Sequence, residues 1–119
     1  MIGRIHHVQV AMPRDEEAAA RAFYGDLLGF EEIAKPENLA KRGGAWFQTG
    51  NLQLHLGVDA DFTPAKKAHV AYEVSDLAAV RERLISAGVA IVEDDDLPGF
   101  ERFYVADPFG NRVEILQPL

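Results

Sequence analysis

The sequence predicts an α+β fold made of two consecutive βαβββ modules, and three observations carry this prediction. A strand pattern followed by an amphipathic helix pattern occurs at the start of the chain and again in its second half. The segment His7–Met12 is echoed by His69–Val74, with the two histidines at equivalent places. A Gly-Asn pair, Gly50-Asn51 in one half and Gly110-Asn111 in the other, precedes the last strand of each module.

Length and composition favour a single domain formed by both modules, about residues 1–60 and 66–119 of the 119-residue chain. Hydrophobic residues make up 48% and charged residues 26%, which is typical of a globular protein. The formal net charge of −7 makes nucleic acid and acidic membrane surfaces unfavourable partners. The N-terminus lacks the long apolar run of a secretory signal, so we expect a cytoplasmic protein.

In the first module, alternation of apolar and polar residues predicts a strand over residues 5–12. The segment Pro13–Glu17 supplies the proline and acidic first turn of a helix, and Gly29 is placed to end that helix. Three short β-rich segments follow between glycine- and proline-containing turns, at residues 31–34, 45–49 and 52–57.

The second module repeats this order. After the strand at residues 69–74, Ser75-Asp76 is predicted to cap a helix that Gly88 ends. The three remaining predicted strands span residues 89–92, 101–106 and 112–117.

Side-chain parity in these strands gathers possible metal ligands on one face. Successive side chains of a strand point to opposite faces, and the more apolar face is expected to pack on a helix. His7, His55, His69 and Glu114 each lie on the less apolar face of their strand, at related places in the two modules. With no cysteine in the chain, a metal would have to bind imidazole and carboxylate groups. His6 has the opposite parity and is interpreted as structural or exposed.

Three segments resemble the vicinal oxygen chelate superfamily, and together they span nearly the whole chain. They are His7–Val10, the helix end Phe23–Phe30 and, most specifically, Asp107–Glu114. The superfamily includes glyoxalase I, fosfomycin-resistance proteins, extradiol dioxygenases, methylmalonyl-CoA epimerase and bleomycin-resistance proteins. The resemblance implies the glyoxalase/bleomycin-resistance/dioxygenase fold, a cupped mixed sheet that is usually completed in a homodimer and holds a divalent metal.

The resemblance carries over to individual residues with one departure. His7, His69 and Glu114 match the family's metal ligands, whereas the remaining position, His55, is a glutamate in glyoxalase I and a glutamine in the epimerase. His55 is therefore a fourth ligand, a base beside the metal, or a bystander. The ligand types suit zinc, nickel, manganese, cobalt or iron and do not select among them.

Two classes of function follow. The first is a glyoxalase-like enzyme, a lyase or isomerase, in which a metal stabilises an enolate or oxyanion of a small oxygen-rich metabolite or thiol adduct. Glu114 and His55 are its candidate proton-transfer groups, and an extradiol-dioxygenase-like enzyme is a variant of this class. The second class is a metal-free, bleomycin-resistance-like protein that sequesters a cationic compound, which the negative charge favours.

The sequence also suggests residues that line a substrate pocket. Arg112 shares the strand face of Glu114 and is suited to bind an anionic group. Three aromatic residues, Trp46, Phe100 and Phe103, are predicted near the mouth of the cup.

Overall fold

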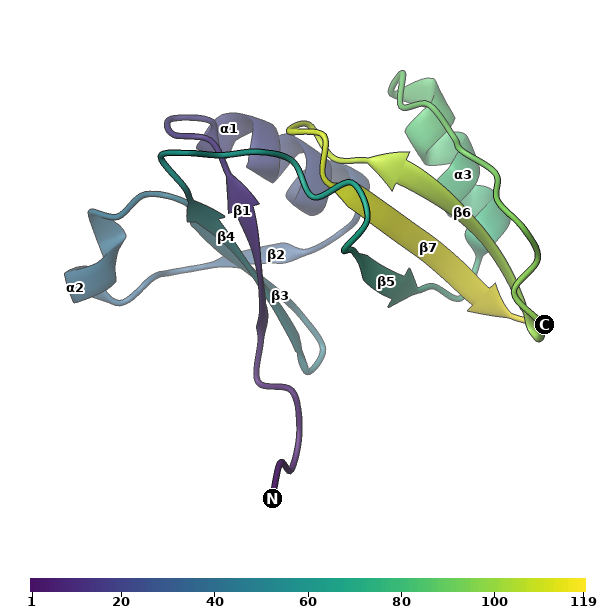
Figure 1. Cartoon of the computed structure of the whole chain (residues 1–119), viewed down its shortest axis with the longest axis horizontal. Coiled ribbons are helices and arrows are strands. Elements are labelled where there is room, and N and C mark those ends of the chain that lie inside the picture. Colours follow the sequence, from purple (N-terminus) through teal and green to yellow (C-terminus); the bar gives the residue numbers. More distant parts are fainter. The chain divides into compact units, whose positions relative to one another are not determined.

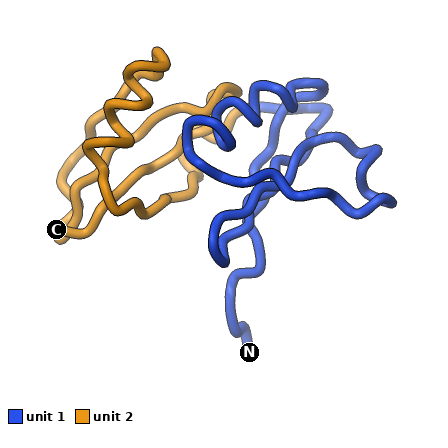
Figure 2. The backbone as a smooth tube through the Cα atoms, turned by 180° about the vertical axis from the view of Figure 1, so that it is seen from behind, with its two compact units in different colours: residues 1–63 blue, residues 64–119 orange.

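The computed structural model describes residues 1–119, which form two compact units, residues 1–63 and 64–119 (Figure 2). Each unit contains one sheet with helical segments (Figure 1). The elements of the first unit are β1 (Val8–Met12), α1 (Glu17–Ala20), the π-helical segment η1 (Arg21–Leu27), β2 (Glu31–Ile33), α2 (Glu37–Ala40), β3 (Ala45–Thr49) and β4 (Leu52–Val58). Those of the second are β5 (Val70–Glu73), α3 (Leu77–Ser86), β6 (Phe100–Ala106) and β7 (Arg112–Pro118).

The sheet of the first unit has the order β1-β4-β3-β2. β1 runs parallel to β4, and the hairpin around Gly50-Asn51 pairs Trp46 with His55. Apolar side chains of one parity in β3 and β4 are buried, as the predicted alternation requires, but His55 of the opposite parity is buried as well. The buried apolar residues of this unit are Met12, Ala20, Phe23, Tyr24, Phe30, Ala45, Phe47, Leu54 and Leu56.

The sheet of the second unit has the order β5-β7-β6, with β5 parallel and β6 antiparallel to β7. Asp76 caps α3 as predicted, because its side chain accepts a hydrogen bond from the Ala79 N–H at 3.0 Å. Gly88 follows the helix with φ of +82°. The buried apolar residues are Tyr72, Leu77, Leu84, Phe103, Tyr104, Val105, Val113 and Ile115.

Several predicted boundaries were wrong. β1 begins at Val8 rather than at residue 5, and the preceding residues are exposed. The strand expected at residues 89–92 is reduced to a single bridge between Val92 and Tyr104. Val89 is not available for a strand because its N–H bonds to the Leu84 carbonyl at the end of α3, at 3.0 Å. The short helix α2 was not predicted.

Backbone geometry between α2 and β3 depends on Gly44. This residue has φ of +82°, and a Cβ atom there would collide with the carbonyl oxygen of Leu56. Only glycine therefore allows β3 to start so close to β4.

None of the helices has the length and the run of apolar residues that crossing a membrane requires.

The turn between β6 and β7 is a buried hydrogen-bond network. Asp107, 4% exposed, accepts from the N–H groups of Phe109 and Asn111 at 2.9 Å each and from Asn111 Nδ2 at 3.0 Å. Asn111 in turn accepts from the Ala65 N–H at 3.0 Å. The Asp107–Asn111 turn thus fixes the start of β7 and ties it to the segment that leads into β5.

We expect Asp107→Ala to lower the free energy of unfolding by about 2 to 3 kcal/mol, because it leaves several buried donors without an acceptor. Urea unfolding followed by fluorescence measures this change. Asp59→Ala is the matched control, since exposed Asp59 accepts a turn hydrogen bond from the Asp61 N–H at 2.9 Å. Equal losses for the two variants would contradict a special role for the buried turn.

Candidate functional site

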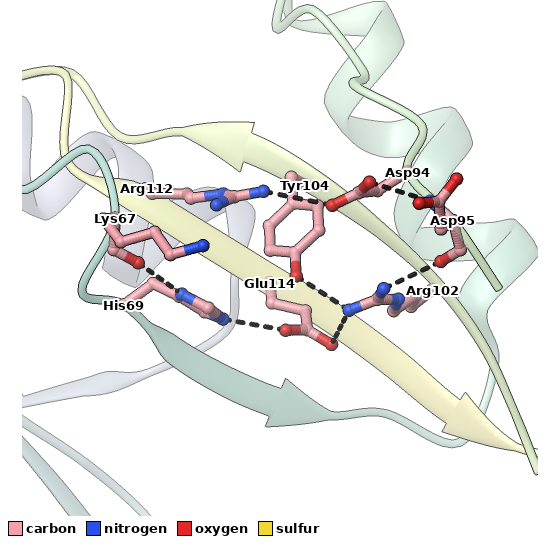
Figure 3. Close-up of polar contacts among 8 residues, drawn as sticks. All are labelled: Lys67, His69, Asp94, Asp95, Arg102, Tyr104, Arg112 and Glu114. Carbon is pink, nitrogen blue, oxygen red and sulfur yellow. Dashed lines mark hydrogen bonds and ion pairs between the residues drawn. The ribbon is translucent and has the colours of Figure 1, made fainter. Parts of the chain in front are cut away.

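A polar cluster lies on one face of the sheet of the second unit (Figure 3). Strand alternation places Phe103 and Val113, which neighbour Tyr104 and Glu114 in sequence, on the other face. His69 directly precedes β5, Glu114 lies in β7 and Tyr104 in β6. The register places Tyr104 opposite Glu114, and it places Ala71, two residues after His69, beside Glu114. Alternation along neighbouring strands therefore brings these side chains together, as the sequence parity indicated for His69 and Glu114.

His69 and Glu114 form the centre of this cluster. His69 Nε2 lies 2.8 Å from Glu114 Oε1, and His69 Nδ1 lies 2.9 Å from the carbonyl oxygen of Lys67. A carbonyl can only accept, so Nδ1 carries a proton and donates it to Lys67. The 2.8 Å contact between Nε2 and Glu114 Oε1 is a hydrogen bond, because a metal ion needs about 2.0–2.2 Å to each ligand atom and cannot lie between two atoms this close.

Glu114 is 4% exposed and is ionised at neutral pH. Burial by itself raises the pKa of this carboxyl group, but hydrogen bonds from His69, Tyr104 and Arg102 outweigh that effect and leave the pKa below its ordinary value. Arg102 Nη1 lies 3.4 Å from Glu114 Oε2. The ionised carboxylate has the form that a ligand or a base needs, and its two oxygens are engaged by His69 and Arg102.

Two arginines surround Tyr104, which is 5% exposed. Arg102 donates to the Tyr104 hydroxyl oxygen at 2.7 Å and to the carbonyl of Asp95 at 2.7 Å. The Arg112 guanidinium lies over the Tyr104 ring, 3.8 Å from its centroid, and donates to Asp94 at 3.3 Å. Burial and the charge of Glu114 raise the pKa of Tyr104, so its phenol stays protonated at neutral pH.

The candidate ligands of the first unit lie in a stack of rings. His55 is stacked on Trp46 with centroids 3.9 Å apart and an interplanar angle of 3°. The His7 ring covers the other face of His55, with centroids 4.1 Å apart and an angle of 16°. His55 is 3% exposed, whereas His7 is exposed.

The stacked His55 is neutral at physiological pH. Burial, followed by the positive charges of His7, His6 and Lys35, lowers the pKa of His55 from 6.5 to about 4. Its Nε2 lies 3.2 Å from Gln53 Oε1, which makes Nε2 the donor and leaves the Nδ1 lone pair available. Neutral imidazole is the form that binds metals, but a ring with this pKa is a weak base at pH 7.

His6, which the sequence assigned to a structural or exposed role, is exposed and touches His7. The two Nδ1 atoms are 3.0 Å apart, so one ring donates and the other accepts. When the Nδ1–H of His7 donates to His6, the Nε2 lone pair of His7 is available to bind a metal ion.

The candidate metal ligands lie as two separate pairs, one in each unit. Each unit brings two of the candidate ligands together, His7 with His55 and His69 with Glu114, and no group of three or more His, Cys, Asp or Glu residues is gathered in the chain. The ligand types are suitable, and a carbonyl partner on the second nitrogen, as at His69, is usual for a metal-binding histidine. These donor types are ones that a divalent metal takes, and binding of a metal by these residues stays a prediction.

The predicted substrate-pocket residues fall in different places. Trp46 and Arg112 contact the ring stack and the Glu114 cluster, respectively. Phe103 is fully buried on the other face of β6, where the Arg81 guanidinium lies 4.9 Å from its ring centroid. Phe100 lines a cavity of about 490 Å³ beside α3, whose lining also includes Asp94, Asp95 and Arg102 of the polar cluster. The structure does not bring Phe103 to the candidate ligands.

Arg102 and Tyr104 are the residues that our sequence-based selection left out. The signal was present, because Tyr104 has the strand parity opposite to Phe103 and its position in β6 faces Glu114. Whether Tyr104 or Phe103 faces Glu114 depends on the register between β6 and β7. The length of the Asp107–Asn111 turn does not fix this register from the sequence alone.

Comparisons with known proteins agree with this architecture. A family model described as the glyoxalase/bleomycin resistance protein/dioxygenase superfamily matches residues 4–115. The ethylmalonyl-CoA/methylmalonyl-CoA epimerase of Cereibacter sphaeroides is 32% identical over 105 residues, covering 77% of this chain and 76% of that protein. Glyoxylase I 4 of Arabidopsis thaliana is 27% identical over 123 residues, covering 93% and 68%.

Solved structures show the same fold. A glyoxalase family protein from Bacillus anthracis is 49% identical, with a TM-score of 0.95 and coverage of 100% of this chain and 98% of that one. A glyoxalase/dioxygenase from Nostoc punctiforme, at 22% identity, has a TM-score of 0.77 with coverage of 98% and 92%.

Proposed function

Because the chain belongs to the glyoxalase/bleomycin resistance protein/dioxygenase superfamily, we propose that it is a metal-dependent lyase or isomerase acting on a small oxygen-rich metabolite or thiol adduct. The proposed metal ligands are His7, His55, His69 and Glu114. The metal is a divalent ion of the zinc, nickel, manganese, cobalt or iron group.

The contact between His69 and Glu114 is the observation that supports this proposal best. Their Nε2 and Oε1 atoms face each other at 2.8 Å, while Nδ1 is committed to the Lys67 carbonyl. The contact is a hydrogen bond as it stands, and an imidazole with its Nδ1–H on a carbonyl beside a carboxylate is a pair of groups that would hold a divalent cation if they parted slightly.

A divalent ion, when bound, would supply Lewis-acid stabilisation of negative charge on a substrate oxygen. The chain's own groups then move the proton. Glu114 is one candidate, since hydrogen bonds hold its carboxylate in the ionised form that can accept a proton once it leaves the metal. His55 is the other candidate; both are weak bases at neutral pH, because the pKa of the Glu114 carboxyl is lowered and that of His55 is about 4. Tyr104 remains protonated and can donate a hydrogen bond to an oxygen that gains charge.

The names of the relatives support a reaction in which a proton moves. One is an epimerase and the other a glyoxylase. An epimerase inverts one carbon centre, and removal of a proton next to a stabilised oxyanion achieves such an inversion. For this chain the same reaction type is a proposal.

Metal analysis of protein purified without an affinity tag tests the proposal. We expect about one divalent ion per chain, and turnover of a dicarbonyl, thiol conjugate or thioester that stops when the ion is chelated. His7→Ala and His69→Ala are expected to lose both the metal and the turnover. Full metal content in both variants would contradict the proposed ligands.

A second candidate function is a metal-free binding protein for a cationic compound. The Arg102 guanidinium lies 3.4 Å from Glu114 and compensates its charge without a metal, which supports the metal-free state. The net charge of −7 favours a cationic ligand. Absence of metal together with tight binding of organic cations would support this function.

We also propose that the chain forms a homodimer. Apolar side chains near the N-terminus are largely exposed, with Ile2 at 97% and Ile5 at 73%, which favours their burial in an interface. Light scattering measures the oligomeric state. Mixing His7→Ala with Glu114→Gln protein then tests whether one site draws ligands from two chains, because only a shared site regains metal in the mixture.

A further inference from the structure

The polar cluster of Figure 3 holds the basic side chains of Lys67, Arg102 and Arg112 close to the carboxylates of Glu114 and Asp94. Asp95 contributes its main-chain carbonyl, which accepts from Arg102, and an exposed carboxylate that balances the third basic side chain. A metal ion sharing Glu114 would leave these basic side chains in excess of the carboxylates that remain to balance them.

Arg112 is held in place but weakly engaged. Its guanidinium lies flat over Tyr104, 3.8 Å from the ring centroid, and its side chain is 27% exposed. The hydrogen bond to Asp94 is long, at 3.3 Å, and the Asp94 side chain is itself 41% exposed. A planar guanidinium fixed by an aromatic ring, with donors left over, is suited to bind a second carboxylate.

The Asp94 carboxylate lies close enough to Arg102, Arg112 and Lys67 to feel the positive charge of all three. The pKa of its carboxyl group is lowered first by the Asp95 N–H and then by Arg102, Arg112 and Lys67. The Lys67 side chain runs between Arg112 and His69, with its amino group directed toward Tyr104 (Figure 3). Asp94 belongs to an exposed loop and can therefore leave this position without disturbing the sheet.

We propose that the cluster is an anion-binding subsite and that the substrate carries a carboxylate, which replaces Asp94 on Arg112 and Lys67 beside His69 and Glu114. Asp94 acts as an internal competitor that occupies the subsite when no substrate is bound. That the bound carboxylate belongs to a substrate rests on the function proposed above. Binding of the carboxylate itself does not, since the basic side chains are present without a metal.

The experiment titrates isotope-labelled, metal-free protein with malonate and, separately, with its neutral diamide, at constant ionic strength. Chemical shifts of the backbone amides around Glu114 and of Arg102 Nε–H report binding. Arg102 Nε is a suitable reporter because it is buried without a hydrogen-bond partner. We expect saturable shifts with malonate and none with the diamide.

Variants of the loop and of the cations make the test specific. Arg112→Gln is expected to weaken malonate binding about tenfold or more, as loss of a charged hydrogen bond usually does. Asp94→Asn is expected to tighten it roughly two- to fivefold, because a weak surface ion pair no longer competes. Asp96→Asn changes the same charge in the same loop, makes none of these contacts and should leave the affinity unchanged.

Equal shifts with malonate and the diamide, or unchanged affinity in both Arg112→Gln and Lys67→Gln, would overturn the proposal. Tighter binding in Asp96→Asn as strong as in Asp94→Asn would also overturn it, because the effect would then reflect net charge alone. A protein that binds malonate in this way but never takes up metal would refute the proposed function and leave the anion subsite standing.

Discussion

Replacing Glu114 by glutamine is expected to lower divalent-metal affinity by more than about a hundredfold, since loss of a mere hydrogen-bond partner of a ligand already costs about 10- to 100-fold. The amide keeps the shape of the side chain, so the sheet should still form. Its oxygen is a poor ligand, however, and it carries no charge to balance Arg102 or the metal. Turnover should be lost with the metal. Competition with a chromophoric chelator measures the affinity.

Glu101→Gln is the matched control for this change. Glu101 is an exposed carboxylate on β6, the strand that pairs with β7, and its replacement should leave metal affinity and turnover unaltered. A Glu114→Gln protein that binds metal as tightly as the parent would remove Glu114 from the ligand set. Thermal unfolding of the metal-free variants separates a ligand effect from a folding defect, which would shift the transition without metal.

The second large effect concerns acid stability. The unfolded chain protonates His55 near pH 6.5, whereas the folded protein does so only near pH 4. Between these values the unfolded state binds more protons, so stability is lost as the pH falls through this window and levels off below it. For this nearly fully buried ring the loss attributable to His55 is up to about 3 kcal/mol. Urea unfolding of the metal-free protein at several pH values measures it.

His55→Phe should be less sensitive to acid than the parent by this amount. Phenylalanine keeps an aromatic ring between Trp46 and His7 but has no group to protonate. His6→Gln removes an exposed histidine whose charge contributes less than burial and His7 to lowering the His55 pKa, so this comparison variant should keep most of the parent's dependence on pH. Parallel curves for the parent and His55→Phe would show that His55 is not the residue responsible.

Local patterns were sufficient for much of the fold. Strand parity placed His69 and Glu114 on one face, and the structure shows them in contact. The stack of Trp46 on His55 was also encoded, since a hairpin turning at Gly50-Asn51 pairs these two positions. Strand parity gives the face on which a side chain lies but not its partner on the neighbouring strand. The pairing of Trp46 with His55 follows only when residues are counted outward from the Gly50-Asn51 turn.

Other features depend on competition that a single segment does not reveal. The strand expected at residues 89–92 is lost because Val89 completes the end of α3, and the acidic loop that follows does not continue the ladder. Tyr104 and Phe103 have equal claims to the functional face in the sequence. Only the register across a five-residue turn, fixed by buried Asp107 and Asn111, decides between them.

The Asp107–Asn111 turn has a consequence for how the protein can vary over generations. Asn111 holds the Ala65 N–H, and two residues later the Lys67 carbonyl selects the tautomer of His69. Substitutions in that turn can therefore change the basicity of the His69 imidazole without contacting it. Mutations at such distant positions can tune His69 in small steps during evolution, while His69 and Glu114 themselves stay the same.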